Sequence, residues 1–216
     1  AAEVNPQVIS PTGAVRPGLE PHQTTHFSIV DAAGNAVSNT VTLNWDYGSG
    51  VVVEGAGFLL NNEMDDFSVK PGAPNLYGVV GGTANEVAPG KRMLSSMSPT
   101  ILLRDGRVAM VVGTPGGSTI FTSVFQAIIN IIDFGMTPQQ AVAAPRFHHQ
   151  LLPPDEVVYS PCCALPAATI TGLTERGYTP RPSDWEFGDV QIVWVDAAGS
   201  VSAGSDPRGR GEVRIR

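Results

Sequence analysis

The first regular alternation of apolar and polar residues along the chain predicts a β-hairpin. The stretch THFSIVDAAGNAVSNTVTLN, residues 25–44, alternates well enough for two half-buried strands joined by a tight turn at Ala33–Asn35. Residues 51–60 continue as extended chain that glycine interrupts. The clearest hairpin is predicted over residues 100–112, where Asp105-Gly106 is the favoured turn pair.

Helical spacing of apolar residues appears after the second hairpin. It predicts a helix from about Ser118 to Phe134, because apolar side chains recur at intervals of three and four residues. A second helix is expected through Ala144, with Thr137 as its cap and Pro138 at its first position.

The last third of the chain predicts one more helix and two more strands. The helix runs from about Ala167 to Arg176 and ends at Gly177. Strands follow at residues 191–196 and near Val201. The order of strands, helices and strands indicates an α+β fold in which helices cover stacked antiparallel sheets.

Composition agrees with one large folded domain. The chain has 216 residues, of which 42% are hydrophobic and 15% charged, so it can bury a substantial core. Residues 1–23 differ: they contain four prolines and no strand or helix period, which predicts a linker or tail. The chain starts at Ala1 without methionine or a signal peptide, and we expect it to be a piece of a longer protein.

Charge and cysteine content exclude several classes of function. The net charge of −7 argues against a nucleic-acid partner, which would need a basic surface. No apolar run is long enough to span a membrane. Cys162 and Cys163 are adjacent. We expect no bridge between them, and their spacing gives no zinc site, so we assign them a structural or incidental role.

Thr24 stands where the tail meets the first predicted strand. A threonine hydroxyl is a weak nucleophile that needs a base. If the chain were cut before Thr24, the liberated α-amine, with a pKa of about 8, would be that base. On its own the position is weak evidence, because threonine is common in strands and an ordinary strand residue is the favoured interpretation.

An acidic stretch, NNEMDD at residues 61–66, opens a polar loop that extends to residue 82. Its side-chain oxygens suit a cation, either a metal ion or a substrate ammonium, although the spacing is not that of an EF-hand. The alternative is a solvated acidic loop. A structured loop of this length is uncommon unless it is functional.

Glycines and hydroxyls gather around the second hairpin. GTPGGS, residues 113–118, lies between a predicted strand and a helix, where backbone amides suit a phosphate or an oxyanion. It has neither the Walker nor the dinucleotide spacing, and a simple tight turn is the alternative. Ser95, Ser96 and Ser98 suit a carboxylate or a turn. We expect structural roles for His148 and His149, because consecutive residues point in different directions.

Taken together, these segments resemble the γ-glutamyltranspeptidase family. TTHFSIVD, LLNNEMDDFS, KPGAPNLYG, LSSMSPTI, GTPGGS and APRFHHQ occur in the family's order, and SDPR follows at residues 205–208. The resemblance implies the αββα sandwich of N-terminal-nucleophile hydrolases. It also implies self-cleavage between Gln23 and Thr24, so that residues 1–23 end a large subunit and residues 24–216 form the catalytic small-subunit domain.

The family's residue roles carry over to matching positions. Thr24 would attack a γ-glutamyl amide and form an acyl-enzyme, with support from Thr42. Gly116 and Gly117 would supply the oxyanion amides. The substrate-binding residues would be Glu63 and Asp66 at the α-ammonium, Asn44, Ser95 and Ser96 at the glutamyl head group, and Tyr77 in a lid over the site.

The resemblance implies a transferase and hydrolase that acts on glutathione and related compounds and uses water or an amino acid or peptide as acceptor. No metal or other cofactor is expected. The partner would be the large subunit of the same precursor, in the periplasm, outside the cell or on its outer surface. Two alternatives stay open: a cephalosporin or glutaryl-type acylase on the same scaffold, and a non-catalytic binding domain.

Overall fold

The computed structural model describes residues 24–215, and the predicted hairpins are confirmed there. β1 (Thr25–Val30) pairs with β2 (Ala36–Val41), and β3 (Thr100–Arg104) pairs with β4 (Arg107–Gly113). The second hairpin continues into an antiparallel sheet of order β3-β4-β8-β9, completed by β8 (Gln191–Val195) and β9 (Val201–Ser205).

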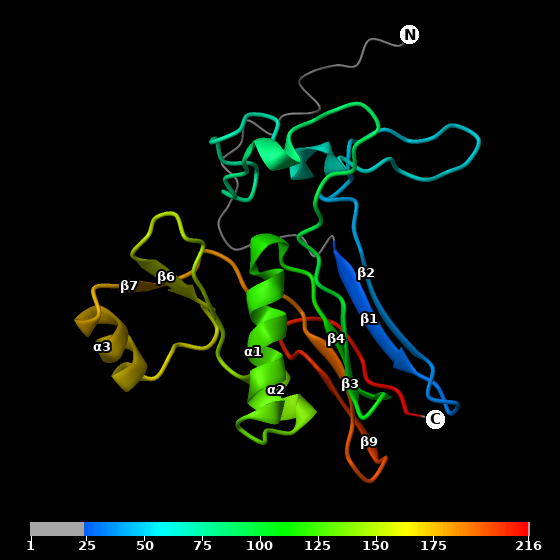
Figure 1. Cartoon of the computed structure of the whole chain (residues 1–216), viewed down its shortest axis with the longest axis vertical. Helices are drawn as coiled ribbons and strands as arrows, with labels where there is room; N and C mark the ends of the chain where they lie inside the picture. The colour runs from blue at the N-terminus through cyan, green and yellow to red at the C-terminus, as the bar shows by residue number, and fades with distance from the viewer. Residues whose placement is uncertain (1–23, 216) are drawn as a thin grey trace.

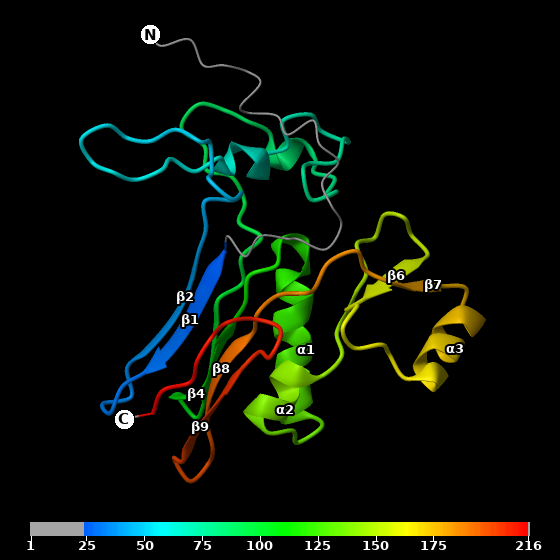
Figure 2. The same ribbon diagram turned by 180° about the vertical axis from the view of Figure 1, so that it is seen from behind.

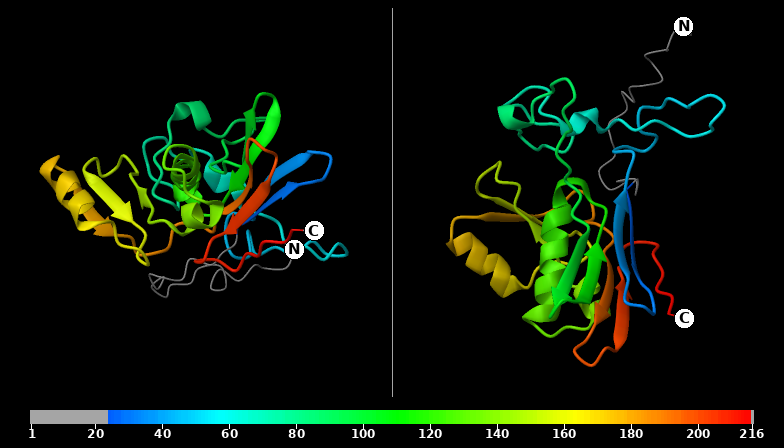
Figure 3. Two further views of the ribbon diagram at one scale, coloured as in Figure 1. Left: turned by 90° about the horizontal axis from the view of Figure 1, so that it is seen from below. Right: turned by 45° about the vertical axis from the view of Figure 1, so that its right-hand side comes forward.

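Two helices cover one face of this sheet, and the β1–β2 hairpin stacks on the other. α1 (Ile120–Ile132) and α2 (Pro138–Ala143) pack against β4, β8 and β9, and the hairpin packs against β4 and β8 (Figure 1). Figure 3 shows the helices, the sheet and the hairpin in succession. The described residues therefore form a helix–sheet–sheet stack, with a core of β4, β8, α1 and α2 side chains.

The start of α2 illustrates how local sequence fixes an element. The Thr137 side chain accepts a hydrogen bond from the Gln140 amide, while the Gln140 side chain accepts one from the Thr137 amide, as a capping box does. Pro138 fills the first helical position, where no amide donor is needed. The predicted helix boundary is confirmed.

A third sheet, which the sequence did not predict, lies beyond α1. It consists of β5 (Phe147–His148), β6 (Glu156–Tyr159) and β7 (Thr179–Pro182), and α3 (Ala167–Glu175) joins the last two. β6 and β7 are parallel, unlike the strands of the two stacked sheets, which are antiparallel as predicted. The helical crossover explains the difference, because it returns the chain to run in the same direction.

The cysteine prediction is wrong: Cys162 and Cys163 form a disulfide with each other. They lie in a turn after β6, where the Cys163 amide donates to the Ser160 carbonyl and the Cys162 amide to the Glu186 carboxylate. This turn brings the two neighbouring sulfurs together, which sequence spacing alone does not indicate.

Residues 42–99 form a lobe at the end of the sandwich where β1 begins. Figures 1 and 2 show this lobe above the start of β1 and the first turn of α1. It is mostly loop, as predicted for residues 61–82, with two short 3-10 helices, η1 (Glu63–Asp66) and η2 (Thr83–Asn85). Residues 51–60 contain one antiparallel bridge, between Val52 and Leu59.

Candidate active site

A small cavity lies where the lobe meets the stack, and it collects most of the predicted site residues. Separate segments contribute its lining, which consists of Thr24, Thr42, Asn44, Glu63, Asp66, Tyr77, Ser96, Met97, Gly117 and Ile120. Eight of these ten were candidates from the sequence. Gln23, the other residue of the predicted cleavage site, lies outside the described residues.

The hairpin register brings Thr24 to Thr42. Thr25 pairs with Val41, so the residues that precede β1 and follow β2 lie next to each other. The Thr24 hydroxyl donates to the Thr42 hydroxyl at 2.9 Å, and the Thr42 oxygen also accepts from the Asn44 amide at 2.9 Å. Thr42 therefore fixes both the rotamer of Thr24 and the start of the next loop.

The glycine pair forms the turn between β4 and the helix. Gly116 and Gly117 have φ angles of 136° and 52°, a region that strongly favours glycine. A β-carbon on Gly117 would lie 2.9 Å from the Tyr77 ring, and one on Gly116 would lie 2.8 Å from the Thr119 hydroxyl. η3 (Gly117–Thr119) and α1 follow at once, so the positive end of a helix dipole lies beside the cavity.

Two carboxyl groups face each other across one turn of η1. Residues three apart eclipse on a 3-10 helix, which places Glu63 and Asp66 on the same side. Burial, the Asp66 charge and a hydrogen bond to Asp66 raise the pKa of Glu63 to about 7, and burial also raises the pKa of Asp66. The pair therefore holds a proton more strongly than isolated carboxyl groups do, and a cation placed between the two groups would stabilise both as carboxylates.

Tyr77 covers the cavity from the lobe. Its hydroxyl donates to the Asn44 carbonyl and its ring packs on Gly117, so one side chain connects the lobe to the glycine turn. The Asn44 side chain donates to the Asn62 carbonyl at 3.4 Å. Ser96 lines the cavity, whereas Ser95 is exposed, does not line it and accepts a hydrogen bond from the Met97 amide.

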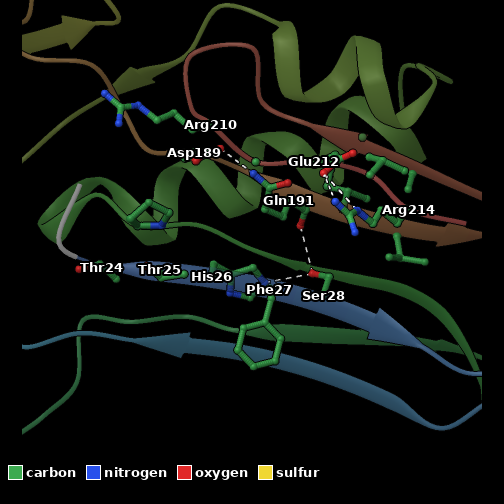
Figure 4. Close-up of a pocket in the computed structure, with 17 residues that line it drawn as sticks. Thr24, Thr25, His26, Phe27, Ser28, Asp189, Gln191, Arg210, Glu212 and Arg214 are labelled. Atoms are coloured by element: carbon green, nitrogen blue, oxygen red, sulfur yellow. Dashed lines mark hydrogen bonds and ion pairs between the residues drawn. The ribbon is translucent and has the colours of Figure 1, made fainter. Parts of the chain in front are cut away.

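A longer groove of about 750 Å³ meets this cavity at Thr24, the one residue that lines both. Figure 4 shows the groove running along β1 from Thr24 to Ser28, with Asp189, Arg210, Glu212 and Arg214 on its opposite side. The nucleophile candidate is thus accessible from two directions.

A buried charge network that joins two distant segments was not predicted. Asp206 accepts from the guanidinium groups of Arg146, at 2.5 Å, and Arg208, at 2.9 Å, and from the Val190 amide. Arg146 is 1% exposed. Arg146 belongs to the segment APRF, and Asp206 and Arg208 belong to the segment SDPR. No pattern of apolar and polar residues in the sequence indicates that these two segments lie in contact.

The paired histidines have structural partners. The His148 ring contacts Thr122 and Gln150, and the His149 ring contacts the Pro154 carbonyl. Within residues 24–215, no cluster of histidine, cysteine, aspartate and glutamate has the geometry of a metal site. In the same part of the chain, no helix combines the length and apolar character needed to cross a bilayer.

Comparison with known proteins gives a consistent result. The family model for gamma-glutamyltranspeptidase matches residues 1–215. The chain is 64% identical to a glutathione hydrolase proenzyme of Pseudomonas aeruginosa over 211 residues, an alignment that covers 98% of this chain. It is 46% identical to the glutathione hydrolase proenzyme of Escherichia coli over 215 residues, which covers 96% of this chain. It spans 38% and 36% of those two proteins, so it corresponds to little more than a third of each.

Among solved structures, the chain is similar to gamma-glutamyltranspeptidase from Pseudomonas nitroreducens complexed with L-DON. The TM-score is 0.83 and the identity 57%, over 89% of this chain and 99% of that one. This likeness confirms the predicted α+β, N-terminal-nucleophile αββα fold, of which the described residues form three layers.

Proposed function

Because the chain belongs to the γ-glutamyltranspeptidase family, we propose that the complete protein is a γ-glutamyl transferase and glutathione hydrolase that acts through Thr24. One observation carries the proposal: a threonine hydroxyl, a pair of carboxyl groups and a glycine turn line the same cavity. The first is a nucleophile, the second binds an ammonium, and the third stabilises an oxyanion.

Self-cleavage between Gln23 and Thr24 would create the catalytic base. As long as Thr24 is joined to Gln23, its nitrogen is an amide and cannot accept a proton. Once free, the α-amine of Thr24 accepts the hydroxyl proton while the oxygen bonds to the γ-carbonyl carbon of the substrate.

The glycine turn would act on the tetrahedral intermediate. The amides of Gly116 and Gly117 stabilise the oxyanion, the carbon–nitrogen bond breaks, and the departing amine takes the proton held by the Thr24 amine. Water or an acceptor amine then attacks the acyl-enzyme, gives up a proton to the same base and releases Thr24. Thr42 contributes by holding the Thr24 hydroxyl.

The acid pair would select γ-glutamyl groups. A substrate α-ammonium between Glu63 and Asp66 would offset the burial and the mutual repulsion that raise the pKa values of the pair. Asn44, Ser95 and Ser96 bind the glutamyl head group, the two serines mainly at its α-carboxylate. Ser95 does so from just outside the residues that line the cavity. Tyr77 serves as a lid, held in place by its bond to the Asn44 carbonyl.

The partner is proposed to be the large subunit cut from the same precursor, with residues 24–216 as the small subunit. The hairpin turns apolar side chains outward, because Phe27, Ile29 and Val37 are 42%, 50% and 47% exposed. α1 likewise exposes Phe121 and Phe125. Apolar faces of this kind are typical of surfaces that another chain covers. We further propose a periplasmic, secreted or outer-surface location.

The acylase alternative is less favourable, since a plain acyl group has no ammonium to place between Glu63 and Asp66. A non-catalytic domain is also less favourable, because the nucleophile, the acid pair and the glycine turn all line or border one cavity. Preference for a glutaryl anilide over the γ-glutamyl anilide would support the acylase.

The proposal is tested on the complete precursor with Thr24→Ala and the hydroxyl-retaining control Thr24→Ser. We expect Thr24→Ala to abolish both cleavage and turnover, and Thr24→Ser to retain measurable levels of each. Turnover by Thr24→Ala would remove Thr24 from its role. A denaturing gel and release of anilide from a γ-glutamyl anilide are the two measurements.

A further inference from the structure

His26 stands two residues after Thr24 and points between the two sheets. It lies on the inner face of β1 and is 7% exposed. Its ring rests on Gly113, the last residue of β4, so closely that a β-carbon there would overlap the ring atoms Cε1, Nδ1 and Nε2. Gly113 precedes the Gly116–Gly117 turn by three residues. A single side chain therefore separates the strand of the nucleophile from the strand that leads to the oxyanion amides.

Two hydroxyl groups hold this ring in one orientation. Nδ1 lies 2.7 Å from the Thr40 hydroxyl, and Nε2 lies 3.0 Å from the Ser28 hydroxyl. Ser28 donates its only hydroxyl proton to the Gln191 carbonyl of β8, at 3.2 Å. Its oxygen must then accept from Nε2–H, which leaves Nδ1 to accept from Thr40. The contacts thus select one neutral tautomer and connect three strands through it.

The surroundings keep the ring uncharged. Burial lowers the pKa of His26 to about 4, and no acidic side chain is hydrogen-bonded to it. The inner-face side chains nearest His26, those of Ser28, Ser38 and Thr40, are small and polar, and Ser38 donates to the Val112 carbonyl at 3.1 Å. His26 is consequently the bulky group that sets the separation of the two layers at the active-site end.

We propose that His26 is a positioning residue, a ring wedged against Gly113 that sets the distance between the Thr24 hydroxyl and the Gly116–Gly117 amides. The inference rests on the proposed function and adds a residue that borders the longer groove but does not line the cavity that holds the catalytic groups. The oxyanion forms only during the reaction, so an error in this distance lowers kcat and leaves binding of the ground-state substrate unchanged. A misplacement of about 1 Å can reduce the rate by about 100-fold.

The test is a double-mutant cycle of His26→Ala and Gly113→Ala in the complete, mature protein, with turnover expressed per cleaved small chain. We expect His26→Ala to lower kcat by about 10- to 100-fold with KM within threefold. Gly113→Ala forces a methyl group into the ring and lowers kcat at least as far. In the double variant the methyl occupies space that the ring has left, so kcat should exceed that of Gly113→Ala by at least fivefold.

A second readout separates positioning from a general structural effect. A boronic acid analogue of the γ-glutamyl group forms a tetrahedral adduct that resembles the transition state, and its affinity should fall with kcat in His26→Ala. Ser38→Ala is the matched control, since it removes another inner-face polar contact to β4, and its kcat should stay within twofold of the parent. If His26→Ala fails to mature, His26→Gln, which keeps a polar side chain at this position, takes its place in the cycle.

Unchanged kcat in His26→Ala, no recovery in the double variant, or an equal loss in Ser38→Ala would each overturn the inference. Absence of Thr24-dependent turnover in the parent protein would instead contradict the proposed function, and the two failures are therefore distinguishable.

Discussion

Replacement of Glu63 by Gln tests how the acid pair selects its substrate. Glu63 has its pKa raised to about 7, first by burial and then by Asp66. It is an acid, so it becomes charged as the pH rises through 7, and only the charged form binds an ammonium strongly. The Glu63→Gln variant keeps the shape of the side chain but loses this titration.

The expected size follows from that pKa. A group with a pKa of about 7 is about 10% ionised at pH 6 and about 90% ionised at pH 8, so its contribution to kcat/KM should rise about ninefold over this range. A charge-assisted hydrogen bond contributes about 1.5–3 kcal/mol. Loss of the Glu63 charge at pH 8 should therefore reduce kcat/KM for a γ-glutamyl substrate by about 13- to 160-fold.

The assay compares a γ-glutamyl anilide with a glutaryl anilide, which lacks the ammonium. The ratio of their kcat/KM values cancels the titration of the Thr24 amine, since both substrates use the same base. We expect this ratio to rise about ninefold from pH 6 to pH 8 in the parent protein and to stay flat in Glu63→Gln. Glu54→Gln, which removes an exposed charge of the same lobe that does not line the cavity, is the control, and its ratio should rise as in the parent. A flat ratio in the parent, or an unchanged slope in Glu63→Gln, would refute the reasoning.

Three further substitutions test other parts of the account. Asp206→Asn leaves the buried Arg146 guanidinium without its carboxylate, and we expect a loss of about 3–5 kcal/mol in the free energy of unfolding, measured by denaturant titration. Thr42→Val removes the oxygen that accepts the hydrogen bond from the Thr24 hydroxyl, the proposed nucleophile. Loss of a hydrogen bond of about 0.5–1.5 kcal/mol should slow turnover by about 2- to 13-fold, with wild-type rates contradicting the role. Tyr77→Phe removes the bond to the Asn44 carbonyl, so KM should rise several-fold while kcat changes by less than threefold, and an unchanged KM would argue against the lid.

The elements that the sequence predicted are those with strong local signals. The first hairpin has clear alternation and a turn, and its register then places Thr24 beside Thr42 without further information. α2 was predictable because Thr137 and Pro138 form a recognisable start. The glycine turn was predictable for the same reason, as glycines between a strand and a helix indicate a special backbone geometry.

Features that depend on distant contacts were not predictable. β7 has the sequence TPRP, and the low strand propensity of proline gave no indication of a strand there. The prolines are tolerated because β7 is an edge strand, whose amides on one side need no partner in the sheet. The Arg146–Asp206 ion pair joins residues 60 positions apart. His26 would pass as an ordinary strand residue in sequence, because its importance depends on the contact with Gly113.

The central claim is that Thr24 is both the new N-terminus and the nucleophile. Its most direct test is mass spectrometry of the mature small chain after reaction with an electrophilic γ-glutamyl analogue. The account predicts a chain that begins at Thr24 and carries the adduct on that residue. A chain that begins elsewhere, or an adduct on any other side chain, would contradict it.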